Sequence, residues 1–168
     1  MAQIQKFSLS YDPAEDRLVW DAEDREGSTL RMWMTQRLCK AMVEAMTPML
    51  VQATTPQTAR GQEAAVQSWE QAAAMAELGK TAPVKPQPQQ LAGLIKTVNI
   101  RPAGADLVLT FDFGAPEPCA MGLKLHELRQ MLAVLHRLYV SAGWPVDIWP
   151  QWIAEPETAT AGAAGSVN

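Results

Sequence analysis

The chain alternates apolar and polar residues over three short stretches and then changes to helical spacing. Phe7, Leu9 and Tyr11 alternate with polar residues, and residues 17–21 and 29–34 show the same period of two. That period predicts half-buried β-strands. Apolar residues then recur three and four positions apart, which predicts a helix. Residues 6–52 therefore predict a unit of strand, strand, strand and helix.

Side-chain directions follow from these periods. We expect residues 22–28 to form a charged hairpin loop, Thr35 to cap the helix, and Pro48 to kink or interrupt it. The strand residues expected to point inward are Leu18, Trp20, Leu30, Met32 and Met34. The expected inward stripe of the helix is Leu38, Met42, Ala45 and Met49, widened by Ala41 and Met46.

The same plan returns eighty-nine residues later. Residues 11–20 match residues 100–109 without a gap, and a one-residue insertion then places Leu38 on Leu128. In this second unit, residues 95–143, the expected inward strand residues are Leu107, Leu109, Phe111, Phe113, Cys119, Met121 and Leu123. A helix over residues 125–142 is expected to bury Leu128, Leu132, Leu135 and Tyr139 and to end at Gly143.

The repeat predicts an α+β fold. We expect a tandem duplication with one antiparallel sheet and both helices packed on one face, and residues 1–153 as a single domain. Residues 53–90 have no counterpart in the repeat and contain an Ala-rich helix, about 60–78, with a thin apolar face. That face is Ala65, Trp69, Ala72 and Met75. Two interpretations stay open, a connecting helix laid across the domain or an arm that docks on a partner.

The C-terminal region has two parts. Residues 144–153 are rich in Trp and Pro, and they either cap the core or form an exposed interface. Residues 154–168 have the composition of a disordered tail.

Composition narrows the class of protein. The chain has 168 residues and a net charge of −4, and it contains two cysteines in apolar surroundings. We expect buried thiols and a cytoplasmic location. The sequence shows neither a signal peptide nor an apolar stretch long enough to span a bilayer, so no membrane association is expected.

The search for catalytic motifs finds none. His126 and His136 are ten residues apart on one predicted helix, which is too far to share a metal ion. Zinc-ligand spacing, a phosphate-binding loop and a nucleophile elbow are all absent from the sequence. We therefore expect a non-catalytic protein without a cofactor.

The sheet face opposite the helices offers one kind of binding surface. It is expected to display several basic residues, hydroxyl groups and the indole of Trp33, a surface on which single-stranded nucleic acid can stack. The order of elements over residues 6–142 resembles the Whirly and PUR-repeat single-strand nucleic-acid binders. The resemblance is one of topology, and no binding residue is inferred from it.

The preferred hypothesis is a protein interaction or assembly protein, with a protein partner or a second copy of the chain bound on the same face. The salt dependence of binding distinguishes protein association from nucleic-acid binding, because the affinity for phosphate falls steeply as the salt concentration rises. The candidate binding residues are Arg17, Val19, Arg31, Trp33, Arg101, Val108, Lys124, Trp144 and Trp149.

Overall fold

The computed structural model of the chain describes residues 1–54, 61–79, 82–87 and 90–156. Within them it forms seven strands and four helices, a mixed α+β fold. The strands are β1 (Ala2–Asp12), β2 (Arg17–Asp24), β3 (Thr29–Met34), β4 (Leu91–Leu94), β5 (Thr97–Ala103), β6 (Asp106–Asp112) and β7 (Cys119–Leu123). The helices are α1 (Gln36–Thr54), α2 (Glu63–Ala76), α3 (Leu125–Ala142) and α4 (Gln151–Ala154). The predicted tail from residue 157 on, and parts of the predicted insert, lie outside the described residues.

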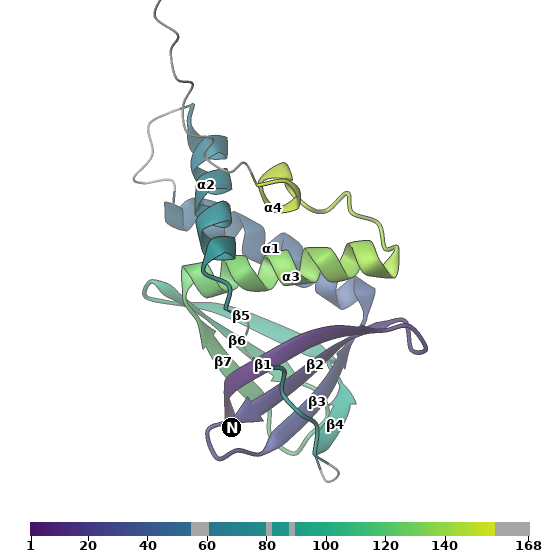
Figure 1. Cartoon of the computed structure of the whole chain (residues 1–168). Coiled ribbons are helices and arrows are strands. Elements are labelled where there is room, and N and C mark those ends of the chain that lie inside the picture. The colour runs from purple at the N-terminus through teal and green to yellow at the C-terminus, as the bar shows by residue number, and fades with distance from the viewer. Residues whose placement is uncertain (55–60, 80–81, 88–89, 157–168) are drawn as a thin grey trace, which may run out of the picture.

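The seven strands form one curled sheet in the order β4-β3-β2-β1-β7-β6-β5. Figure 1 shows this sheet below α1 and α3, with α4 farther from the strands. The prediction of an antiparallel sheet was wrong, because β1 runs parallel to β7 and β3 runs parallel to β4. Alternation within a strand fixes which side chains point inward, but it does not specify which distant strand becomes the neighbour.

One hydrophobic core joins the strands to α1 and α3. Its buried strand residues include Leu18, Trp20, Leu30, Met32, Met34, Leu107, Leu109, Phe111, Phe113, Cys119, Met121 and Leu123, as predicted. Val98 and Ile100 on β5, which were also expected to be buried, pack against this core but are only half-buried. The period of two therefore identified the inner face of β2, β3, β6 and β7 correctly.

Two parts of the sheet were not predicted. Strand β2 continues to Asp24 instead of ending before a loop at residue 22, and both Ala22 and Asp24 are buried. Strand β4 is a short run without alternation, so it gave no strand signal. Its Gly93 lies so close to the carbonyl oxygen of Phe113 that a Cβ there would clash with it. Glycine thus permits β4 to pack against the end of β6.

Helix α1 begins as predicted, and its buried face overlaps the predicted one in part. The Thr35 hydroxyl accepts a hydrogen bond from Leu38 N at 3.3 Å, which confirms the N-cap. Pro48 is exposed and does not interrupt the helix, which was one of the two effects predicted for it.

Of the predicted stripe of α1, Met42 and Met46 are buried and Leu38 and Met49 are half-buried, whereas Ala41 and Ala45 are exposed. The remaining buried residues are Cys39, Val43 and Leu50, so the buried face is rotated from the predicted one. Spacing alone did not select it, because apolar residues also lie outside the predicted stripe.

Helix α3 agrees with its prediction. Leu128, Leu132, Leu135 and Tyr139 are all buried. Gly143 ends the helix with a φ of 69°, a left-handed conformation that glycine adopts without strain.

Helix α2 packs on α3 with its polar side, so the predicted apolar face was wrong. Gln71 Nε2 donates to the Arg129 carbonyl at 3.0 Å, and Gln130 Nε2 donates to the Ala74 carbonyl at 2.8 Å. Trp69, which was expected to be part of the packed face, is 52% exposed. The polar side is buried because α3 presents hydrogen-bonding groups to it.

The Trp-rich segment covers the core. Trp144 and Trp149 are buried, and both rings make T-shaped contacts with the ring of Tyr139 on α3. Part of this segment forms the short helix α4 rather than extended chain, and Ile153 is the buried residue of that helix. The capping interpretation of this segment is therefore confirmed.

Candidate binding site

A cleft opens where β1 separates from β7. The parallel pairing of these strands joins Ala2 to Cys119 and Gln3 to Ala120, and it extends no farther. Strand β1 continues alongside β2 and pairs with it to the end of the strand. This pairing has an irregularity between Ile4 and Lys6. The separation leaves a cavity of about 500 Å³ between β1, β7 and α3.

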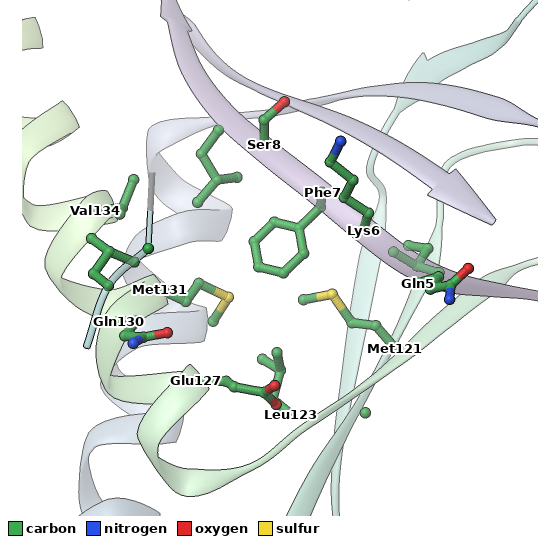
Figure 2. Close-up of a pocket in the computed structure, with 15 residues that line it drawn as sticks. Gln5, Lys6, Phe7, Ser8, Met121, Leu123, Glu127, Gln130, Met131 and Val134 are labelled. Carbon is green, nitrogen blue, oxygen red and sulfur yellow. The ribbon is translucent and has the colours of Figure 1, made fainter. Parts of the chain in front are cut away.

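The cleft has an apolar interior and a polar rim. Figure 2 shows the side chains of Phe7, Met121 and Met131 pointing toward one another from three different elements. The remaining lining residues are Ile4, Gln5, Lys6, Ser8, Leu9, Leu78, Gly79, Gly122, Leu123, Glu127, Gln130 and Val134. An apolar interior with a few polar groups at its edge is typical of ligand-binding sites.

Most polar groups on the rim already have partners. The Glu127 carboxylate accepts a hydrogen bond from Lys124 N at 2.8 Å as part of the N-terminal cap of α3. Ser8 Oγ accepts a hydrogen bond from Val84 N at 3.2 Å. Lys6 forms no ion pair with any described residue. Lys6 is therefore a cation that remains available to a bound group.

The described residues hold no reactive constellation. Burial raises the pKa of the Cys39 thiol to about 12 and that of the Cys119 thiol to about 11, so both remain protonated at neutral pH. Both cysteines are free and buried, as expected. Burial lowers the pKa of His136, which contacts the Trp149 ring and lies outside the cleft. No three His, Cys, Asp or Glu residues in the described part of the chain are placed to hold a metal ion.

The candidate residues on β2 and β3 are more covered than the sequence indicated. Val19 is only 6% exposed. Arg31 binds Asp21 through two hydrogen bonds of 2.8 and 2.9 Å, and these bonds raise the pKa of the guanidinium. Trp33 is half-buried, and its Nε1 has no hydrogen-bond partner among the described residues.

The insert covers this face of the sheet. Val84 N donates to Ser8 Oγ on β1, and Gln87 N donates to Thr29 Oγ1 on β3 at 3.3 Å. Figure 1 shows the teal segment between α2 and β4 crossing in front of these strands. The sequence contained no signal for this crossing, because residues 82–87 have no regular period.

The other candidate residues do not lie on one surface with Val19, Arg31 and Trp33. Arg17 lies 3.5 Å from the Glu15 carboxylate beside a hairpin, and Lys124 is exposed at the start of α3. Arg101 and Val108 pair with each other on β5 and β6. Since Trp144 and Trp149 are buried in the core, the nine candidates form several separate groups rather than one surface.

Sequence reasoning missed the cleft. Lys6 and Ser8 are among the basic and hydroxyl-bearing residues that were expected on the open sheet face, but the α3 residues Glu127, Gln130 and Val134 carried no functional signal. The cleft depends on where two parallel strands stop pairing, which alternation cannot indicate.

Comparison with protein-family models, curated proteins and solved structures found no match to this chain. The resemblance to the Whirly and PUR-repeat proteins thus stays a prediction. No helix in the described part of the chain is long and apolar enough to cross a membrane.

Proposed function

We propose that this protein is a non-catalytic interaction protein that binds a polypeptide partner in the cleft between β1 and β7. The observation that carries the proposal is the form of the cleft. Two strand edges that have stopped pairing face an apolar interior, and a free lysine stands at the rim. This combination suits a partner that has both main-chain hydrogen-bonding groups and apolar side chains.

The chemistry of the cleft supports binding rather than catalysis. Acid–base catalysis requires a group that is free to exchange a proton with a substrate. Glu127, the carboxylate on the rim, already serves the helix cap. The two thiols lie in the core and are protonated.

We also propose that the chain is a tandem repeat with an offset of eighty-nine residues. Strand pairing supports the repeat in the second hairpin of each half and in the parallel pairs, where corresponding residues have corresponding partners. The first hairpin departs from it by two residues, since Tyr11 pairs with Leu18 but Ile100 pairs with Leu109. The matching pairs are Leu18 with Met34 and Leu107 with Leu123, and then Leu30 with Leu91 and Cys119 with Ala2. The parallel pairs carry most weight, because nothing in a single hairpin fixes their register.

The helices support the same offset. Helix α1 begins at Gln36 and α3 begins at Leu125. The residues that correspond to the five buried residues of α1 are all buried in α3, namely Leu128, Met131, Leu132, Leu135 and Tyr139. No insertion is needed, whereas the sequence comparison had placed Leu38 on Leu128. All of these side chains enter one core, as helices packed on the same side of the sheet would.

The binding proposal is tested with peptides. Dodecapeptides are selected from a random displayed library on the wild-type protein, and their affinities are measured by fluorescence anisotropy. Val134 is half-buried and lines the cleft from α3. Val134→Trp fills the cleft and should weaken the selected peptides by at least about tenfold, a loss of roughly 1.4 kcal/mol.

The matched control is Trp69→Ala, because Trp69 is exposed on α2 and does not line the cleft. This variant should bind the peptides within about twofold of wild type. Thermal unfolding of both variants checks that the fold is retained. Peptides that bind Val134→Trp normally, or that lose affinity for Trp69→Ala instead, contradict the cleft as the binding site.

A further inference from the structure

The edge of β7 that faces the cleft is no longer paired with β1 at Gly122, because the pairing of these strands ends at Ala120. The counterpart of Gly122 in the first half is Trp33, whose carbonyl accepts a hydrogen bond from Ile95 N at 2.8 Å, on the β4 side of β3. Trp33 pairs with Val19, and Gly122 pairs with Val108, at the same position in the two hairpins. The N–H and C=O of Gly122 therefore point away from β6 and toward the cleft.

The two halves differ in how far this edge is covered. On β3, strand β4 forms four parallel pairs, the last two with Met32 and Trp33. On β7, strand β1 forms only two, with Cys119 and Ala120. The places left uncovered are at Met121 and Gly122, and both residues line the cleft. The edge of β3 is thus covered by β4 at the positions where the corresponding edge of β7 faces the cleft.

We infer that the cleft takes an extended polypeptide segment that adds to the free edge of β7 as a parallel strand, as β4 does on β3. The inference rests on the proposed function and specifies the backbone conformation of the partner. Strand addition obtains affinity from main-chain hydrogen bonds and specificity from pockets for alternate side chains.

The side chains around the edge define the chemistry of the segment. An inward residue would contact Phe7 and Met131, so it should be apolar. On the other side of β7, a Cβ added at Gly122 would meet nothing within 4 Å, which leaves room for an outward residue. The unpaired Lys6 at the rim favours an acidic residue there.

Single N-methylation of the selected dodecapeptides is the first test. Each methyl group removes one main-chain donor and leaves the protein unchanged. In a bound strand, successive N–H groups point to opposite sides, so a sensitive position should lie between two tolerant ones. Methylation of the one N–H that donates to the Gly122 carbonyl should weaken binding by about five- to tenfold.

Variants of Gly122 test the protein side of the same hydrogen bonds. Gly122→Pro removes the N–H that faces the cleft, and Gly122→Ala retains it in a place where the added Cβ has space. The first should weaken the peptides by about tenfold and the second by less than about twofold. Thermal unfolding identifies loss of fold in the proline variant, in which case the methylated peptides decide.

The outcomes separate the two proposals. If Val134→Trp abolishes binding but no methylation weakens it by more than about twofold, the cleft binds peptides in another conformation and strand addition is overturned. The alternative occupant of the cleft is a small amphipathic acid, and dansyl-undecanoate is the probe for it. Enrichment of no peptide, together with Val134-dependent binding of that acid, overturns both proposals.

Discussion

Trp144 Nε1 donates a hydrogen bond of 2.8 Å to Asp16 Oδ1, and Tyr11 OH donates one of 2.7 Å to the same oxygen. Asp16 lies in the hairpin between β1 and β2 with a φ of 48°. The Trp144 ring also meets the Tyr11 ring edge-on, with centroids 5.6 Å apart. This contact ties the C-terminal segment to the first hairpin of the chain.

Asp16→Asn should lower the melting temperature, and more so at neutral pH than in acid. The hydrogen bonds from Tyr11 and Trp144 lower the pKa of the Asp16 carboxyl. Its stabilising effect is therefore present above the unfolded-state pKa and is lost as the pH falls through the folded-state pKa. Thermal unfolding from pH 7 to pH 3 measures the difference. Glu26→Gln, an equal charge change on an exposed loop, is the control, and equal losses in both variants would contradict the contact.

Gly93→Ala should destabilise the fold by about 1–3 kcal/mol, because the new methyl group would clash with the Phe113 carbonyl. Backbone is on the other side of this contact, so the strain cannot be relieved by a side-chain rotation. Gly122→Ala is the control, since its Cβ has open space. Urea unfolding of both variants compares them, and similar free energies of unfolding would show that β4 does not pack closely on β6.

Arg129→Ala should loosen α2 and cost on the order of 2–4 kcal/mol. Arg129 is 2% exposed, and its Nη2 donates to Gln67 Oε1 at 2.7 Å while its Nη1 donates to the Gln67 carbonyl at 3.3 Å. The guanidinium also lies over the Trp152 ring, 5.4 Å from its centroid. The substitution leaves the buried Gln67 Oε1 without its donor.

Hydrogen exchange provides the measurement for Arg129→Ala. Exchange should rise in α2 and α4 and change little in β2 and β3, which do not contact this side chain. Arg101→Ala is the control, because Arg101 is exposed on β5. Unchanged exchange in α2 would mean that the Gln71 and Gln130 hydrogen bonds hold it without Arg129.

A mixed-sequence single-stranded oligonucleotide should bind no more tightly than about 100 µM at physiological salt, the weak end of nonspecific binding. Arg31 is committed to Asp21, and residues 82–87 cross the face on which bases would stack. Fluorescence anisotropy at low and high salt measures this. Tighter, salt-sensitive binding that Arg31→Ala abolishes and Arg137→Ala, an exposed position on α3, preserves would favour the nucleic-acid hypothesis instead.

Local pattern determined the parts of this fold in which one side of an element is clearly apolar. Leu107, Leu109 and Phe111 lie on one side of β6, and the other side carries Thr110 and Asp112, so β6 had one clearly more apolar face, and α3 likewise had one apolar stripe ending at Gly143. Burial of apolar surface rewards these side chains whichever strands become neighbours. For this reason the sequence alone was sufficient to predict them.

Tertiary structure decided the rest, because several faces of nearly equal polarity competed. Helix α1 carries apolar residues beyond one stripe, and its position over the strands selected Val43 over Ala45. Helix α2 buried Gln71 rather than Trp69 because α3 offered hydrogen-bonding groups at that place. The cleft also belongs to this class. It exists because β1 stays paired with β2, its hairpin partner, but stops pairing with the distant strand β7 beyond Gln3, and no local period encodes where that parallel pairing ends.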